Sequence, residues 1–380
     1  MSNLRLVPFE VEIPELEVED LRRRLRATRW PDAEVVDDWS QGAPLAYVQD
    51  LCRWWADDYD MGLAGRINAF PQWKVELDGL GIHFLHVRSP EATALPIVLT
   101  HGWPGSITEL LDVIGPLTDP AAHGGDPADA FHVVVPSLPG YGWSDKPTEP
   151  GWGVERIGRA WHELMTGLGY DRYVAQGGDW GSAVTSAMAT QAPDGLLAIH
   201  LNFAVALPDA DMMSDLTPTE AQALADIGVH AETGMGYSGQ QSTRPQTLGY
   251  GLADSPAGQL AWIVEKFWAW TDGSGHPEGA LTRQQMLDDV STYWFTNTAA
   301  SSARLYWESF KRLQAPSPIE LPAAITVFPK EIIRPSRRCA EKLFTDLRWF
   351  EEVAHGGHFA ALEQPAIFVD QLRGCFRPFR

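Results

Sequence analysis

The segment from Gln176 to Ser182 contains the clearest candidate for chemistry in this sequence. It is Gln-Gly-Gly-Asp-Trp-Gly-Ser, between a short apolar run, Tyr173–Ala175, and an alanine-rich segment without internal proline or glycine, residues 183–192. A strand, a glycine-flanked turn and a helix in this order are typical of a nucleophile elbow, in which a strained turn lifts one side chain above a parallel sheet. Here that side chain would be the carboxylate of Asp179. Aspartate is also a favoured helix N-cap, so the turn alone leaves both roles open.

A second candidate is the loop after an apolar strand predicted at Pro96–Thr100. Its sequence is His-Gly-Trp-Pro-Gly-Ser, from His101 to Ser106. In proteins with a nucleophile elbow, a backbone amide of such a loop and the amide after the nucleophile form the oxyanion hole. We therefore predict that the backbone N–H groups of Trp103 and Trp180 serve as its donors. The alternative is an ordinary strand-to-helix loop.

A general base and its acidic partner are predicted near the end of the chain. Histidine is the usual base because its pKa lies near neutrality. Both His355 and His358 are candidates, and we favour His358 because the two glycines before it suit a loop that turns back over the site. Glu331, just beyond the penultimate predicted strand, stands between nucleophile and histidine in chain order, as a triad acid should. Three other acids lie less clearly at the carboxyl end of a strand: Glu320, Asp346 and Glu352.

Four motifs and the N-terminal segment together carry a likeness to a known family. The motifs are His-Gly-Trp-Pro-Gly-Ser, Gly-Gly-Asp-Trp-Gly-Ser, Phe-Pro-Lys-Glu and Gly-Gly-His-Phe-Ala-Ala-Leu-Glu-Gln-Pro. They resemble the microsomal-type epoxide hydrolases of the α/β-hydrolase fold, and residues 7–9 and 27–32 are similar to that family's extra N-terminal domain. The likeness covers essentially the whole chain. It implies Asp179 as nucleophile, His358 as base and Glu331 as the partner of His358.

The resemblance also implies two tyrosine proton donors in a helical cap. Tyr237, in Gly-Tyr-Ser, fits the first, and Tyr306, in Arg-Leu-Tyr-Trp-Glu, fits the second. Opening an epoxide leaves a basic alkoxide, and a phenol with a pKa of about 10 is still protonated at neutral pH. Packing within the cap is the alternative role for both. Three tryptophans are predicted to contact the substrate: Trp103, Trp180 and Trp268.

The predicted elements place these residues on an α/β scaffold. Short apolar strands that alternate with helical segments indicate a mostly parallel sheet covered on both faces. Residues 205–318 show helical segments without a strand pattern, so we expect a helical cap over the elbow. The expected parts are an N-terminal extension of helices and a hairpin, a first core segment, the cap and a second core segment: residues 1–90, 91–204, 205–318 and 319–380.

Composition limits the partners and the compartment. The 380 residues include 50 acidic and 29 basic side chains, and the net charge of −21 argues against nucleic acid or an anionic membrane as the main partner. Three scattered cysteines, no signal peptide and no apolar run of membrane-spanning length predict a cytoplasmic protein without a membrane anchor. We expect no metal and no organic cofactor. The expected partner is a small-molecule epoxide, and the sequence leaves a homodimer open.

The predicted function is hydrolysis of an epoxide to a vicinal diol. Asp179 would form a covalent ester, which water activated by His358 would then hydrolyse. Of 16 tryptophans, five fall in the predicted cap, which favours a bulky aryl or polycyclic epoxide from detoxification or secondary metabolism. One alternative is a haloalkane dehalogenase, which also uses an elbow aspartate followed by tryptophan but needs no acid. Another is a non-catalytic protein of the same fold that binds small apolar ligands.

Overall fold

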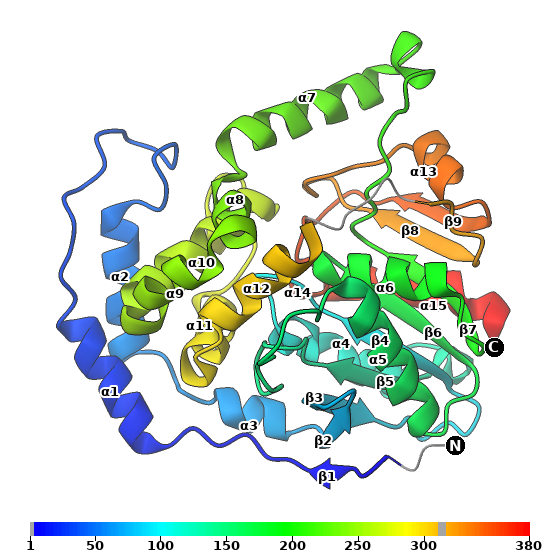
Figure 1. Cartoon of the computed structure of the whole chain (residues 1–380), viewed down its shortest axis with the longest axis horizontal. Coiled ribbons are helices and arrows are strands. Elements are labelled where there is room, and N and C mark those ends of the chain that lie inside the picture. Colours follow the sequence, from blue (N-terminus) through cyan, green and yellow to red (C-terminus); the bar gives the residue numbers. More distant parts are fainter. Residues whose placement is uncertain (1–3, 311–316) are drawn as a thin grey trace.

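The computed structural model describes residues 4–310 and 317–380, and its strands form one sheet (Figure 1). The strand order is β1-β2-β3-β5-β4-β6-β7-β8-β9. In this order, neighbouring strands from β5 to β9 are parallel. Beyond β5 the sheet continues with β3, β2 and β1, each of which pairs antiparallel with its neighbour. The bounds are β1 (Val7–Pro8), β2 (Gln72–Leu77), β3 (Leu80–Val87), β4 (Leu95–Thr100), β5 (Phe131–Pro136), β6 (Tyr173–Gly177), β7 (Leu196–Leu201), β8 (Ala323–Val327) and β9 (Leu347–Glu352).

The central strands are buried on both sides, as their unbroken apolar runs predict. Val174 and Ala175 of β6 are both fully buried, yet they belong to hydrophobic clusters on opposite faces of the sheet. One cluster includes α4 (Leu111–Thr118) and α15 (Pro365–Phe376), and the other includes α5 (Val154–Gly167) and α6 (Trp180–Gln191). The fold is therefore the α/β-hydrolase arrangement of a mostly parallel sheet between two helical layers.

Parallel pairing brings the predicted chemical loops to one edge of the sheet. Thr100, at the end of β4, is the register partner of Gly177, at the end of β6. The loop that begins at His101 and the turn that contains Asp179 therefore start side by side. At the other side of β7 the sheet resumes with β8 and β9, whose ends pair at Val327 and Glu352.

The segment between β7 and β8 forms a helical cap, as predicted. Its helices are α7 (Pro218–Thr233), α8 (Gly236–Thr243), α9 (Pro245–Asp254), α10 (Pro256–Trp270), α11 (Arg283–Thr296) and α12 (Ala299–Ser309). The sequence patterns locate α7, α10, α11 and α12 but not α8 and α9. Residues 311–313, expected to belong to the last helix, lie outside the described residues. Figure 1 shows α7 standing away from the rest of the cap.

The N-terminal segment packs against the cap as well as the core. Its helices α1 (Glu15–Arg26), α2 (Leu45–Asp57) and α3 (Leu63–Asn68) run along the cap in Figure 1. The indole N–H of Trp55 donates to Ser291 Oγ at 3.0 Å, and the Tyr59 hydroxyl donates to Asp288 Oδ1 at 2.6 Å. The predicted hairpin, β2 and β3, belongs to the main sheet. The four-part division of the chain stays a prediction.

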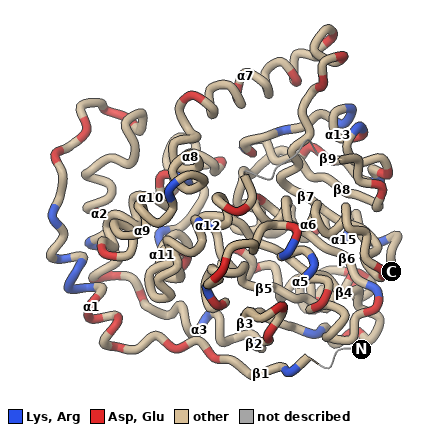
Figure 2. Tube along the Cα trace, viewed as in Figure 1, with Lys and Arg blue, Asp and Glu red and all other residues tan. Residues whose placement is uncertain are grey.

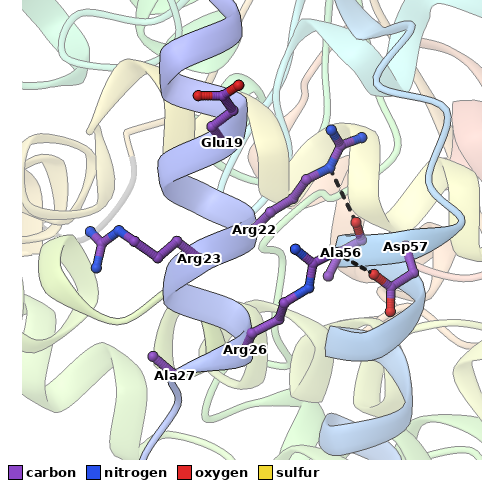
Figure 3. A pocket seen from close by; sticks show the side chains of 7 residues that line it. All are labelled: Glu19, Arg22, Arg23, Arg26, Ala27, Ala56 and Asp57. Atoms are coloured by element: carbon purple, nitrogen blue, oxygen red, sulfur yellow. Dashed lines mark hydrogen bonds and ion pairs between the residues drawn. The ribbon is translucent and has the colours of Figure 1, made fainter.

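Surface charge and a hollow near the N-terminus do not indicate a second reactive site. Figure 2 shows acidic residues spread over the N-terminal segment, the cap and the core. A hollow of about 660 Å³ lies between α1 and α2 (Figure 3). There Arg22 donates to the Ala56 carbonyl at 3.2 Å and Arg26 pairs with Asp57 at 2.7 Å, so these cations already have partners. No helix in the described ranges has the length and apolar character needed to cross a membrane.

Candidate active site

Asp179 occupies a strained turn between β6 and α6. Its backbone has φ 48° and ψ −125°, a region that residues with a side chain rarely adopt. The turn closes tightly, because a Cβ added to Gly177 would lie 2.1 Å from the Gly181 carbonyl oxygen. A Cβ on Gly181 would lie 1.9 Å from the carbonyl oxygen of Thr100. The Asp179 side chain makes no capping hydrogen bond to α6, which leaves its carboxylate available.

The two oxygens of Asp179 have different surroundings. The backbone N–H of Trp103 donates to Oδ1 at 2.8 Å. This approach requires Gly102, where an added Cβ would lie 2.3 Å from Asp179 Oδ1. Trp180 is the first residue of α6, so its N–H is one of the amides that lack a partner within the helix. Oδ1 therefore accepts from a backbone amide, whereas Oδ2 faces His358.

His358 lies between Asp179 and Glu331. Its Nδ1 is 2.7 Å from Glu331 Oε1, and its Nε2 is 3.3 Å from Asp179 Oδ2. The two loops that carry them are paired, since the Lys330 N–H donates to the Gly356 carbonyl at 3.1 Å. His355, by contrast, is exposed. The other acids weighed from the sequence are not buried: Glu320, Asp346 and Glu352.

The charge of His358 depends on both carboxylates. Burial by itself lowers the pKa of His358, but Glu331 and Asp179 together raise that pKa well above its ordinary value. In the resting site the imidazole is therefore held as a cation between two anions. Loss of the negative charge on Asp179 would remove one of the two raising effects and make His358 a better proton acceptor.

Tyr237 and Tyr306 both lie over the elbow, in contact with the two predicted oxyanion-hole tryptophans. Trp103 stacks on Tyr237 with ring centroids 5.1 Å apart, and Trp180 meets Tyr306 edge-on at 4.7 Å. Burial and then the Asp179 charge raise the pKa of Tyr237, and burial raises that of Tyr306 well above its usual value. Both phenols are therefore protonated at neutral pH. The buried Tyr306 hydroxyl has no hydrogen-bond partner within the described residues.

The structure does not bring Trp268 together with the other predicted site residues. Its ring stacks on Trp39 at 5.1 Å, and its indole N–H donates to the Gly275 carbonyl at 3.1 Å. Two residues further along α10, Trp270 packs against His358 with centroids 5.0 Å apart. It also contacts Tyr237 at 5.2 Å. A two-residue step turns a helical side chain by about 200°, so only one of these tryptophans can face the site.

Two further residues near the site were not found from the sequence. Glu109 lines a small cavity with Asp179 and His358. In the sequence, Glu109 comes three residues after Ser106. This Ser-x-x-Glu spacing is typical of a helix capping box, so the pattern predicts no other role for Glu109. Glu363 accepts hydrogen bonds from the backbone of Asp272 and Phe359. The only sequence signal for Glu363 is its position in the motif Gly-Gly-His-Phe-Ala-Ala-Leu-Glu-Gln-Pro. In the described parts of the chain, no three His, Cys, Asp or Glu side chains gather to hold a metal ion.

Comparisons with known families and proteins agree with one another. Residues 6–110 match the family described as Epoxide hydrolase N terminus, and residues 96–227 match the alpha/beta hydrolase fold. A Stigmatella aurantiaca protein, provisionally named an epoxide hydrolase, is 54% identical over 99% of this chain and 86% of its own length. Epoxide hydrolase 1 of Sus scrofa is 31% identical over 96% of this chain and 87% of its own.

Solved structures extend the likeness to the complete fold. The juvenile hormone epoxide hydrolase of the silkworm Bombyx mori superimposes with a TM-score of 0.91 at 29% identity, covering 99% of this chain and 95% of that one. The Aspergillus niger epoxide hydrolase gives a TM-score of 0.89 at 32% identity, covering 99% of this chain and 97% of that one.

Proposed function

Because this chain belongs to the epoxide hydrolase family and is an epoxide hydrolase, we propose that it opens its substrate through a covalent ester on Asp179. Oδ2 attacks a ring carbon, and the carbon–oxygen bond of the ring breaks. Tyr237 and Tyr306 donate to the ring oxygen and supply the proton that the leaving alkoxide needs. The observation that carries the proposal is the unequal setting of the carboxylate, with Oδ1 bonded to Trp103 and Oδ2 next to His358.

The second half of the proposed reaction hydrolyses this ester. Alkylation removes the negative charge of Asp179, so the pKa of His358 falls and its Nε2 can take a proton from water. The hydroxide oxygen attacks Cγ of Asp179, and negative charge develops on Oδ1. The amides of Trp103 and Trp180 stabilise that charge. Glu331 holds the imidazole and balances its positive form, as the acid of a catalytic triad does.

The walls of the site favour a bulky aryl or polycyclic epoxide, from detoxification or from secondary metabolism. Aromatic rings surround the elbow on the cap side, where Trp103, Tyr237 and Trp270 are in mutual contact. Flat rings of a substrate can stack against such surfaces. The similar Bombyx mori enzyme is named for juvenile hormone, so that hormone is a useful competitor in an assay with styrene-type and polycyclic epoxides.

Single turnover in ¹⁸O-labelled water tests the ester directly. The diol of the first turnover should be unlabelled, because its new oxygen comes from Asp179. Label should enter the Asp179 carboxylate as that first ester is hydrolysed and should appear in the diol only on later cycles. Label in the first diol would show direct attack by water and exclude the ester.

His358→Gln separates the two halves of the reaction. The variant should accumulate the ester, and its intact mass should rise by the mass of one substrate. His355→Gln is the matched control, because His355 is exposed in the same loop, and it should turn over normally. Ring opening by His358→Gln without a mass increase would count against His358 as the hydrolytic base.

A further inference from the structure

Lys266 is a buried lysine that has no part in the reaction described so far. It lies in α10, one turn before Trp270, and it is only 4% exposed. Residues four apart in a helix lie on the same face, so Lys266 shares a face with the tryptophan that packs against His358. Lysine is almost never fully buried unless its charge has a partner. Neighbouring groups must therefore offset the cost of placing this ammonium group inside the protein.

An acidic neighbour explains only part of this burial. The ammonium group pairs with Glu265, the one carboxylate that it pairs with in the described ranges. Glu265 is the preceding residue, and consecutive residues of a helix do not face each other. The Glu265 side chain stays 25% exposed, so a lysine directed towards solvent could also reach it. The ion pair by itself therefore does not explain why Lys266 points inwards.

Two aromatic rings of the site lie against the same ammonium group. Lys266 Nζ lies over the ring of Tyr237, 4.4 Å from its centroid, and 5.5 Å from the centroid of the Trp270 ring. A cation within about 6 Å of a ring centroid is attracted to the ring face, most strongly where water is excluded. Of these two rings, the nearer belongs to a group that the proposed reaction ionises.

Ring opening moves negative charge from Asp179 towards Tyr237. As Oδ2 bonds to a ring carbon, the carboxylate becomes a neutral ester and the epoxide oxygen becomes an alkoxide. The phenol O–H bond breaks, the alkoxide takes the proton, and the electron pair stays on the phenolate. The proton that His358 releases once Asp179 is alkylated restores the phenol, so protons and charges balance before the ester is hydrolysed. Burial and the Asp179 charge raise the pKa of Tyr237, so forming this phenolate is costly without a nearby cation.

We propose that Lys266 is a positioning residue for proton donation, and that its ammonium group stabilises the Tyr237 phenolate formed as the epoxide opens. The negative charge of a phenolate spreads into its ring, so the cation attracts the phenolate more strongly than the phenol and lowers the barrier. In the described ranges, no lysine or arginine lies over the ring of Tyr306, so the two phenols are not equivalent. The inference rests on the proposed function, because it needs the ester on Asp179 and Tyr237 as an acid.

Other titratable groups lie near Lys266. Burial lowers the pKa of Lys266, and the charge of Glu265 opposes that change. Burial also lowers the pKa of His230 on α7, and the charges of Lys266 and His358 lower it further, so His230 is neutral near pH 7. Glu265 and Glu331 add to the rise in the pKa of the phenol. The charge over the phenol ring is therefore that of Lys266, and a rise in pH removes it earlier than it would from an exposed lysine.

Rapid-quench mass spectrometry with a styrene-type epoxide measures ester formation and ester decay separately. Lys266→Met keeps an unbranched side chain but removes the charge. Ester formation should slow roughly 10-fold, as expected for the loss of a buried cation over an aromatic ring. Ester decay should stay within about 2-fold of wild type, because that step uses no phenol. Lys266→Arg restores a cation and should recover most of the rate of ester formation.

Lys74→Met is the matched control. Lys74 also pairs with a carboxylate, that of Asp145 at 2.7 Å, and its ammonium group lies 5.8 Å from the centroid of the Phe9 ring. These residues lie outside the site, so both rates should be unchanged in this variant. Normal ester formation in Lys266→Met, or equal slowing of both steps, would overturn the role of Lys266.

A double-mutant cycle shows whether Lys266 acts through Tyr237. In a Tyr237→Phe background, Lys266→Met should change ester formation by less than about 2-fold, because no phenolate forms beneath the cation. The same roughly 10-fold loss in both backgrounds would show that Lys266 acts through packing and would overturn the proposal.

The pH profile is a second readout, which decides even if Lys266→Met does not fold. Wild-type ester formation should fall as pH rises through the lowered pKa of Lys266, since deprotonation removes the cation. Lys266→Arg should lack this fall, because a guanidinium group stays protonated. Identical profiles for the two proteins would contradict the proposal. If wild type forms no ester at any pH, the proposed function fails and this inference fails with it.

Discussion

At the scale of single residues, the two oxygens of Asp179 are not equivalent, and this difference supports the proposed role of Asp179 as the nucleophile. The Trp103 amide holds Oδ1, and His358 stands 3.3 Å from Oδ2. In the proposed mechanism the same amide would stabilise the carboxylate before reaction and the oxyanion after it, so the site would not need to reorganise between the two steps. Aspartate at the elbow with two protonated phenols above it suits a leaving group that must receive a proton. A halide would not need one.

Removing the phenols should slow ring opening and not ester hydrolysis. Tyr237→Phe and Tyr306→Phe should each lower the rate of ester formation by about 10- to 100-fold, because one remaining donor compensates in part. The double variant should form no measurable ester. Quenched single-turnover mass spectrometry gives the rates. Tyr250→Phe, at a 70% exposed position, is the control and should behave as wild type. A double variant with normal ester formation would contradict the role of both tyrosines.

At the scale of elements, the end of α10 and the histidine loop form one hydrogen-bonded unit. The His358 N–H donates to the Trp270 carbonyl at 2.9 Å, and the Gly356 N–H donates to Asp272 Oδ2 at 3.1 Å. Glu363 accepts from the backbone N–H of Asp272 at 2.8 Å. The position and orientation of the His358 imidazole therefore depend on a helix of the cap.

Glu363→Gln should disturb this unit. Glu363 also accepts from the Phe359 N–H at 3.0 Å, so both of its oxygens are in use, and an amide can offer only one. Ester decay should slow several-fold while ester formation changes little, because only decay uses His358 as a base. The control is Glu352→Gln, an exposed glutamate in β9. Equal loss in both steps would indicate a general packing defect instead.

At the scale of the whole molecule, the N-terminal segment supports the cap. Tyr59 and Arg66 both hydrogen-bond to Asp288 of α11, which is far away in sequence. Burial raises the pKa of Asp288, and these two partners oppose that rise. The helices of the cap thus contact the core on one side and the N-terminal helices on the other.

Tyr59→Phe tests this support. The Asp288 carboxylate would lose one of its partners, and we expect the free energy of unfolding to fall by about 1–2 kcal/mol. Arg66 remains bonded to Asp288, which limits the loss. Thermal and urea unfolding measure the change, with Tyr250→Phe as the exposed control. No measurable difference from wild type would show that the contact adds nothing to stability.

The elements that the sequence predicted are those with strong local signals. Short apolar runs located the central strands, and α10 and α11 show clear helical patterns. The cap helix α8 was missed because its sequence, Gly-Tyr-Ser-Gly-Gln-Gln-Ser-Thr, is rich in residues of low helix propensity. Packing against α12 stabilises α8, and the helix propensity of its own residues cannot reveal that tertiary contact.

The sequence by itself determined the residue types at the elbow, the loop after β4 and the Gly-Gly-His motif, because glycine and proline at set spacings restrict the backbone locally. It could not tell which tryptophan of α10 faces His358, nor that Glu109 and Gln176 share a cavity with it. Those relations depend on how a helix is rotated and how distant strands align, which follow from packing over the whole chain. Tertiary structure alone decided that Trp270, not Trp268, contacts His358.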